Sequence, residues 1–182
     1  DALFGRLVDE YKARGLEDDT LFVFVGDHGE GFDEHRNNTL HAHFLYEENV
    51  HAPLVMYAPK LFTHETVSHR LASHVDLAPT ILDLVGVDVP AQMQGQSLVS
   101  DAYKYRPTFL FTSYPDPLIG LRDGDKKFVR NLQTNGDELY DLARDPGEQH
   151  NGARAGPEIV RTYRERLADL VVRQRKVVGD HP

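Results

Sequence analysis

The chain has 182 residues, of which 40% are hydrophobic, and its 29 acidic and 20 basic residues give a net charge of −9. This length and composition fit one ordinary soluble domain, and no apolar stretch approaches the length of a membrane span. The negative charge argues against nucleic acid or an anionic membrane surface as a partner. Since the chain contains no cysteine, it holds no disulfide, no thiolate metal site and no cysteine nucleophile.

The first hundred residues alternate between helical and strand patterns. Apolar spacing predicts a helix over residues 1–14 with one buried face. That face would carry Leu3, Leu7, Val8 and Tyr11. Residues 20–25 and 53–58 lack polar alternation, which predicts strands covered on both faces in a largely parallel sheet. Asp76 is expected to cap a second helix that ends at Gly86.

From residue 108 onward the pattern changes. Short strand candidates are separated by the turn-rich stretches "PDP", "DGD" and "TNGD", which predicts an antiparallel meander. A last helix is expected over about 157–176, and residues 87–107 connect the two parts. We therefore predict an α/β region over residues 1–100 and an antiparallel region with a terminal helix over residues 101–182.

The stretch "FVGDHGEGFDEH" places charged side chains directly after the first strand. Ligands of open α/β sheets collect beyond the carboxyl ends of strands. Gly26 and Gly29 would allow a sharp turn that aims Asp27 and His28 at one point. A carboxylate oxygen and an imidazole nitrogen suit a divalent cation.

The remaining ligands would have to come from elsewhere, and nearby histidines are candidates. These are His35, His41, His43 and His51. His41 and His43 are two positions apart, so they would share a face of an extended segment. Asp, Gly and His are also common turn formers, and no zinc-finger, EF-hand or phosphate-loop motif is present. On the residues alone, a metal or catalytic site and a structural turn both stay open.

Four segments, in chain order, resemble a known family. They are "LFVFVGDHGEGFDEH", "HAHFLYEENVHAPLVMYAP", "SHVDLAPTILDLVGV" with "QGQSL", and "ELYDLARDPGEQHN". Together they resemble the C-terminal half of a sulfatase of the alkaline phosphatase superfamily. The resemblance implies an α/β fold: part of a sandwich with a mainly parallel sheet, then a small antiparallel sheet and a C-terminal helix. It also implies a missing N-terminal half, in keeping with a start at Asp1 inside an amphipathic pattern.

The resemblance assigns roles to individual positions. Asp27 and His28 become ligands of one divalent metal, with calcium favoured and manganese, magnesium or zinc as alternatives. His43 becomes catalytic and substrate-binding, contacting the anionic oxygens or assisting the leaving group, and His41 is a second candidate for substrate binding. The alternative for His43 is a packing role at a helix start. Four further residues are expected to be solvated or to support the site indirectly: Glu30, Glu34, His35 and His51.

The nucleophile of the family is a formylglycine made from a Cys/Ser-x-Pro-x-Arg motif, which this chain lacks. Ser113-Tyr114-Pro115 keeps Ser-x-Pro without the arginine and is expected to be a turn. The resemblance therefore implies metal-dependent hydrolysis of sulfate monoesters by the whole protein, with this chain inactive alone. Its partners would be a small-molecule or sugar sulfate ester and the missing half, and the chain alone is expected to self-associate. An extracytoplasmic location is also implied.

Two other functions stay open. An Asp-His pair also occurs in phosphonate monoester hydrolases and phosphoryl-transfer relatives, so a phosphoryl transferase, phosphodiesterase or phosphonate monoester hydrolase of the same superfamily is one alternative. A non-enzymatic binding or assembly module is the other. The sequence does not name the alcohol or sugar that carries the ester, because substrate pockets are built largely by loops.

Overall fold

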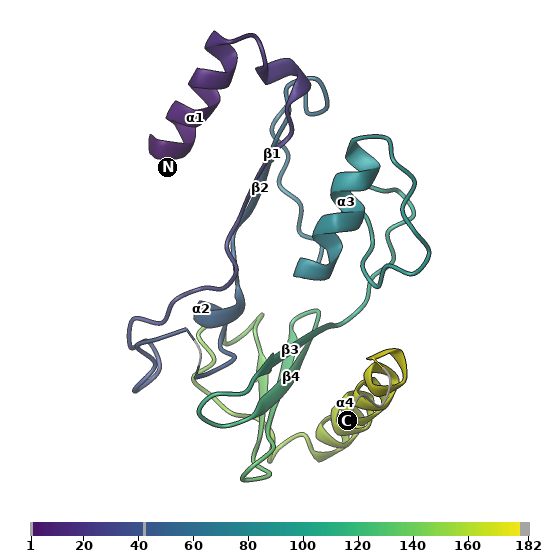
Figure 1. Cartoon of the computed structure of the whole chain (residues 1–182). Coiled ribbons are helices and arrows are strands. Elements are labelled where there is room, and N and C mark those ends of the chain that lie inside the picture. Colours follow the sequence, from purple (N-terminus) through teal and green to yellow (C-terminus); the bar gives the residue numbers. More distant parts are fainter. Residues whose placement is uncertain (1, 42, 179–182) are drawn as a thin grey trace. The chain divides into compact units, whose positions relative to one another are not determined.

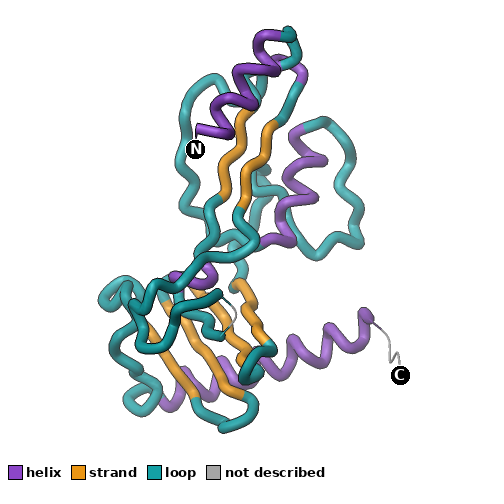
Figure 2. Tube along the Cα trace, turned by 60° about the vertical axis from the view of Figure 1, so that its left-hand side comes forward, coloured by secondary structure: helices purple, strands orange, loops and turns teal. Residues whose placement is uncertain are grey.

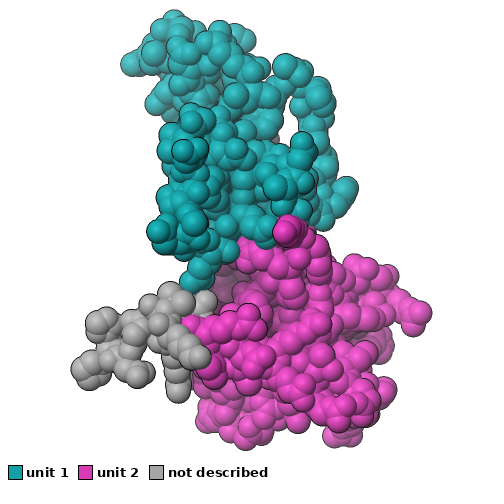
Figure 3. Space-filling model, turned by 90° about the vertical axis from the view of Figure 1, so that its right-hand side faces the viewer, with its two compact units in different colours: residues 1–27, 52–70, 74–103 teal, residues 28–51, 71–73, 104–182 magenta. Residues whose placement is uncertain are grey.

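The computed structural model describes residues 2–41 and 43–178, so the predicted helix start at Asp1 lies outside the described part. The chain divides into two compact units, coloured separately in Figure 3. Unit 1 contains residues 1–27, 52–70 and 74–103, and unit 2 contains residues 28–51, 71–73 and 104–182. The predicted boundary after residue 100 stays a prediction. The units show in addition that residues 28–51 belong with the C-terminal sheet.

Unit 1 begins with helix α1 (Ala2–Ala13), a short 3-10 turn η1 (Glu17–Asp19) and strand β1 (Phe22–Val25), which pairs with β2 (Leu54–Tyr57). The helix lies beside the two strands in Figure 2. Aromatic rings join them, because Phe4 and Tyr11 contact Phe22 with ring centroids 6.2 and 5.1 Å apart. Leu3 and Leu7, which were expected on the buried face, are exposed instead.

The β1–β2 pair is antiparallel, with Phe22 opposite Tyr57 and Val25 opposite Leu54. Both strands were predicted to belong to a largely parallel sheet, and the structure shows that they pair with one another in the antiparallel direction. Parallel neighbours need a crossover connection that carries the chain back to the end where the first strand began. Here β2 starts beside the end of β1, so no crossover is needed. Phe24 and Val55 are 48% and 51% exposed, so the described residues do not cover both faces as expected.

Helix α3 (Leu77–Leu84) follows the short 3-10 turn η2 (His74–Asp76), close to the predicted position (Figure 1). The Asp76 side chain does not cap α3 as predicted. It is buried, and its Oδ1 accepts a hydrogen bond from the Gln96 backbone at 2.7 Å. Gly95 makes this approach possible, because an added Cβ would lie 1.8 Å from the Val75 carbonyl oxygen. The loop around Gly95 is thus fixed against the start of the helix.

Unit 2 is built on the predicted antiparallel meander. Its strands, in sheet order, are β3 (Thr108–Thr112), β4 (Leu118–Asp123), β5 (Lys126–Asn131) and β6 (Asp137–Asp141). Helix α4 (Pro157–Val178) covers one face of this sheet. The shared core consists of Leu121, Phe128, Leu139, Val160, Tyr163 and Leu167.

The opposite face of the sheet receives the segment that leads into helix α2 (Glu47–Val50). Leu45 is buried there against Leu118 and Val129. Side chains alternate along a strand, so Lys127 points to this face while its neighbour Phe128 points to α4. Of the helices in the described ranges, not one combines the length and the apolar character needed to cross a membrane.

Candidate functional site

The predicted site residues begin where β1 ends. The Gly26 N–H donates to the Pro53 carbonyl oxygen at 3.0 Å, which extends the β1–β2 ladder by one residue. The Gly26 carbonyl oxygen accepts from Nε2 of His74 at 2.9 Å. The two peptide groups that flank Gly26 are therefore each held by a hydrogen bond within unit 1, and Asp27 is exposed.

Gly29 has a different role from the one expected. Among the described residues, the glycines with left-handed φ are Gly15, Gly86 and Gly124, so Gly29 is not required for its backbone angles. A Cβ at Gly29 would lie 2.1 Å from the Glu48 carbonyl oxygen, and its N–H donates to the Asn49 carbonyl oxygen at 2.8 Å. The glycine allows the turn to pack directly on α2.

The His28 ring adopts a defined tautomer. Its Nδ1 lies 2.7 Å from the Gly29 carbonyl oxygen, which can only accept, so Nδ1 carries the proton. In a neutral ring the lone pair is then on Nε2. A histidine that binds a metal through one nitrogen usually donates from the other to a carbonyl or carboxylate, and His28 has this arrangement.

His41 lies against His28. The two rings stack with centroids 4.0 Å apart at an interplanar angle of 15°, and His41 Nδ1 lies 3.3 Å from Glu30 Oε2. His28, Glu30 and His41 thus form one exposed group in unit 2. Glu30 was expected to be solvated or to support the site indirectly, and it contacts His41, a predicted substrate-binding residue.

His43 has different neighbours from His41. Its ring is half-buried and lies 5.5 Å from the ring of Tyr114 and 6.3 Å from that of Phe44, measured between centroids. Tyr114 belongs to the connection between β3 and β4, where the Ser113-x-Pro stretch forms a bend, as expected. The rings of His41 and His43 therefore contact different groups.

Helix α2 fixes the loop that carries these histidines. Glu48 Oε1 accepts from His35 Nδ1 at 2.6 Å and from Asn38 Nδ2 at 2.9 Å. Asn49 bonds Asn38 and also donates to the Leu40 carbonyl oxygen at 2.8 Å. Sequence reasoning had expected His35 to be solvated or to support the site indirectly, and the structure gives it the supporting position.

Below α2 lies a group of buried charges that sequence reasoning missed. Lys127 and Glu148 are fully buried, with Nζ 3.0 Å from Glu148 Oε1 and 3.1 Å from Glu47 Oε1. The pair with Glu148 Oε1 is an ion pair without hydrogen-bond geometry. Arg122 lies 2.7 Å from Glu47 Oε2, and the Glu47 backbone N–H donates to Glu148 Oε2 at 2.6 Å.

The two carboxylates differ in their proton affinity. Burial raises the pKa of Glu148 above its ordinary value, and Lys127 only partly opposes it. Burial also acts on Glu47, but Lys127 and Arg122 outweigh it and hold the pKa of Glu47 below its usual value. The motif "ELYDLARDPGEQHN" was assigned a structural role, and Glu148 shows what that role is.

The residues fit part of a metal site. Asp27 and His28 are consecutive and offer an oxygen and a nitrogen donor, and the His28 tautomer suits coordination through Nε2. Within residues 2–41 and 43–178, however, no three His, Cys, Asp or Glu side chains gather as metal ligands. The pair can hold a cation only together with further ligands.

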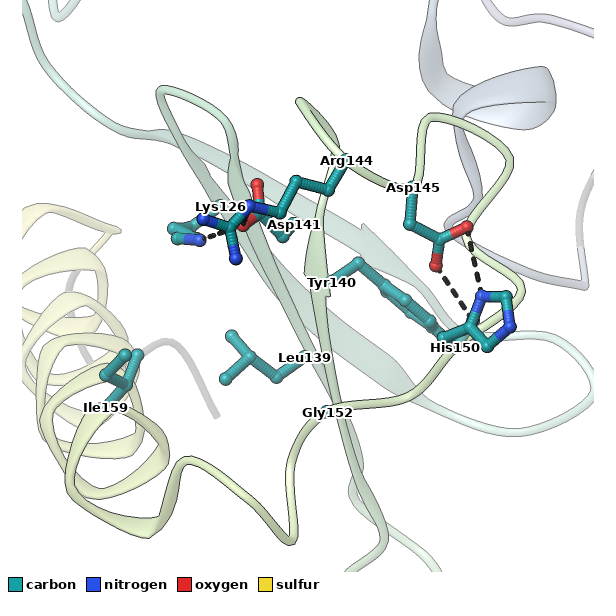
Figure 4. Close-up of a pocket in the computed structure, with 9 residues that line it drawn as sticks. All are labelled: Lys126, Leu139, Tyr140, Asp141, Arg144, Asp145, His150, Gly152 and Ile159. Atoms are coloured by element: carbon teal, nitrogen blue, oxygen red, sulfur yellow. Dashed lines mark hydrogen bonds and ion pairs between the residues drawn. The ribbon is translucent and has the colours of Figure 1, made fainter.

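A hollow of about 370 Å³ lies elsewhere in unit 2 (Figure 4). Its charged lining residues are paired with one another, Lys126 and Arg144 with Asp141, and His150 with Asp145. None of Asp27, His28, His41 or His43 lines it. The hollow is therefore separate from the predicted site.

Comparisons with known proteins identify the relatives of the chain. The family described as Sulfatase matches residues 1–87. A Delta 4,5-hexuronate-2-O-sulfatase of Bacteroides thetaiotaomicron is 31% identical over 86% of this chain and 35% of its own length. A solved 2-O GAG sulfatase is 29% identical, with a TM-score of 0.79 over 92% of this chain and 39% of that one.

A further solved structure, a phosphonate monoester hydrolase of Silicibacter pomeroyi, is 26% identical with a TM-score of 0.72, over 98% of this chain and 39% of that one. These structures support the expected alkaline-phosphatase-like α/β fold with its C-terminal helix. The chain spans about a third of the length of the curated relatives it matches.

Proposed function

Because the chain belongs to the sulfatase family, we propose that the whole protein hydrolyses sulfate monoesters carried by a sugar. The observation that carries the proposal is the Asp27-His28 turn after β1, inside the matched residues, with His28 in the tautomer that a metal ligand needs. A relative named as a hexuronate 2-O-sulfatase and a solved structure named as a 2-O GAG sulfatase support a sulfated sugar as the substrate class.

Asp27 and His28 would hold one divalent cation, calcium first and manganese, magnesium or zinc as alternatives, with the remaining ligands from outside this chain. A bound cation would neutralise charge on the sulfate oxygens and on the nucleophile. The nucleophile, a formylglycine in this proposal, would also come from outside the chain, which has no cysteine. The location we propose for the whole protein is extracytoplasmic.

His43 would act on the leaving group. It is half-buried beside Tyr114, so an ester oxygen in front of it would be partly shielded from water. A protonated ring at this place would donate to a sulfate oxygen or to the departing alkoxide. His41, stacked on His28, would contact the sugar sulfate from the exposed side.

The experiment measures sulfate release by the whole protein from an unsaturated 2-O-sulfated uronic acid disaccharide. His43→Ala should lower kcat about a hundredfold or more, the usual worth of a general acid. Asp27→Asn or removal of the metal by EDTA should abolish turnover, and calcium should restore the EDTA-treated enzyme. His64→Ala, in an exposed loop of unit 1, is the matched control. The proposal would be contradicted if the wild-type protein kept its turnover in EDTA and the His43→Ala variant kept the wild-type kcat.

The similarity to a phosphonate monoester hydrolase makes that activity a second candidate. The same preparation should therefore be assayed on a phenyl phosphonate monoester. A kcat/KM for the phosphonate above that for the sulfated sugar would favour the second candidate over the first.

We also propose that the 182-residue chain alone is inactive, because metal ligands and nucleophile act as a unit with the residues present here. The assay is nitrophenol release from its sulfate and phosphate esters with calcium, manganese or zinc. Turnover above buffer that Asp27→Asn and His43→Ala both abolish would refute this, and would mean that the chain builds a complete site.

A further inference from the structure

The segment that carries His43 is docked on the sheet by three consecutive residues. Leu45 is buried between Leu118 and Val129. Tyr46 stacks on the His35 ring with centroids 3.6 Å apart, and its ring lies 6.2 Å from that of Tyr140 in β6. Glu47 reaches Lys127 near the start of β5. His43 therefore stands two residues before the start of a rigidly held stretch.

The contact of Glu47 with Lys127 is an ion pair at a buried position where apolar side chains could give the fold similar stability. Replacing a buried ion pair by apolar side chains of similar volume is often neutral or stabilising, so a buried Lys127 and Glu148 are not needed for stability alone. What the charges add is direction. Apolar contacts such as those of Leu45 are not directional and allow several positions of the segment on the sheet. The ion pair of Lys127 with Glu47 and the hydrogen bond from the Glu47 N–H to Glu148 can form in only one position.

We propose that Lys127 is a positioning residue for His43, acting through Glu47 and Glu148, and this inference rests on the proposed function. Lys127 touches neither His43 nor the exposed group formed by His28 and His41 in the contacts described. Its effect is to fix the backbone from Leu45 to Glu47 and thereby the place of His43 beside Tyr114.

The test uses the whole protein and the paired variant Lys127→Met/Glu148→Gln. The pair removes both charges together, keeps the side-chain lengths and leaves an amide oxygen for the Glu47 N–H, which avoids an unpaired buried charge. We expect kcat for sulfate release to fall about tenfold to a hundredfold, as for a small misplacement of a catalytic group. The control is Lys126→Met/Asp141→Asn, the neighbouring ion pair at 2.6 Å that faces solvent, which should leave kcat unchanged.

Two readouts separate positioning from a loss of stability. In a His43→Ala background the paired variant should cost almost nothing further, because residues that act through one another are not additive. Amide hydrogen exchange of peptides spanning residues 39–46 should become faster in the paired variant and stay unchanged in the control. An equal loss of kcat with and without His43, or unchanged exchange, would overturn the proposal.

The exchange measurement also distinguishes a failure of the positioning proposal from a failure of the proposed function. If the wild-type protein releases no sulfate from any ester, the proposed function fails and the exchange data decide the positioning alone. Faster exchange over residues 39–46 then supports it, and unchanged exchange rejects it.

Discussion

His74 and Gly26 are 48 positions apart in the sequence and are joined by a hydrogen bond of 2.9 Å from the imidazole Nε2 to the carbonyl oxygen. Since a carbonyl oxygen only accepts, Nε2 carries a proton and Nδ1 is the acceptor of the neutral ring. The bond ties the start of the α3 region to the residue that precedes Asp27. His74 is thus placed to fix the backbone that leads into Asp27, a predicted metal ligand, although His74 is not itself a predicted ligand.

We expect His74→Ala to weaken calcium binding by the whole protein about tenfold, the lower end of what loss of a supporting hydrogen bond costs a metal site. His74→Gln retains a side-chain N–H and should lose less. Titration calorimetry of the metal-free protein with calcium measures both. His64→Ala is the control for removal of an exposed histidine, and a calcium Kd for His74→Ala equal to that of the wild type would contradict the prediction.

The core between α4 and the meander gives a prediction on stability. Phe128 is fully buried against Tyr163 of α4, with ring centroids 5.9 Å apart. Phe128→Ala should lower the free energy of unfolding of the chain by about 3–5 kcal/mol, the range for a large side chain removed from a core. Urea denaturation followed by circular dichroism measures it. Phe111→Ala, at a side chain that is 81% exposed, should cost less than about 0.5 kcal/mol.

The meander was predictable from the sequence because its information is local. Each short strand candidate is bounded by turn-rich residues, and Gly124 supplies the left-handed φ of 60° that the "DGD" turn requires. The direction of β2 relative to β1 was not predictable in this way. It depends on the path of residues 26–53 and on which neighbours the strands have, and an apolar run reads the same in either direction.

The candidate site was predictable only as a set of positions. The alternation of β5 could not show that Lys127 would be buried, because that follows from α2 covering the second face of the sheet. His35 and Glu148 lie 113 positions apart, and Glu148 gives no local signal of its left-handed φ of 52°. Contacts of this range arise from the tertiary fold, which a single sequence does not reveal.

The exposed apolar residues of unit 1 predict self-association of the chain alone. Phe24 and Val55 are opposite one another in the β1–β2 pair and are about half exposed, and Leu3 of α1 is 73% exposed. Apolar surface and unpaired strand edges of this kind promote association. Light scattering of the isolated chain should therefore show oligomers at micromolar concentration.

The variant Phe24→Lys/Val55→Glu should shift the chain toward the monomer, since it replaces an apolar cross-strand pair by two opposite charges. Phe111→Lys introduces a charge at an exposed aromatic side chain of unit 2; it is the control and should not shift the chain toward the monomer. A wild-type chain that is monodisperse and monomeric at high concentration would show that these side chains are not an association surface.

His35 predicts how the stability of unit 2 depends on pH. Its Nδ1 donates to Glu48 Oε1 at 2.6 Å and its Nε2 to the Glu148 carbonyl oxygen at 3.1 Å, so both nitrogens carry a proton when both bonds are made. Burial lowers the pKa of His35, but the hydrogen bonds and the negative charges of Glu48 and Glu148 outweigh it, and the net pKa is raised above the ordinary 6.5.

A raised pKa means that the folded protein binds this proton more tightly than the unfolded chain, so the stabilisation is complete below pH 6.5 and is lost as pH rises through the folded pKa. As pH rises above about 6.5, we expect the free energy of unfolding of the wild-type chain to fall relative to His35→Gln by about 1–2 kcal/mol, the worth of a hydrogen bond to a charged group. After deprotonation Nε2 can only accept, and the Gln149 amide nitrogen, 3.2 Å away, is the available donor. Urea denaturation of both proteins at several pH values between about 5.5 and 8.5, which bracket the usual range of a histidine pKa, measures the difference. If the free energy of unfolding changed with pH in the same way for the wild type and His35→Gln, the prediction would be wrong, because Glu48 would then not favour the protonated His35 ring.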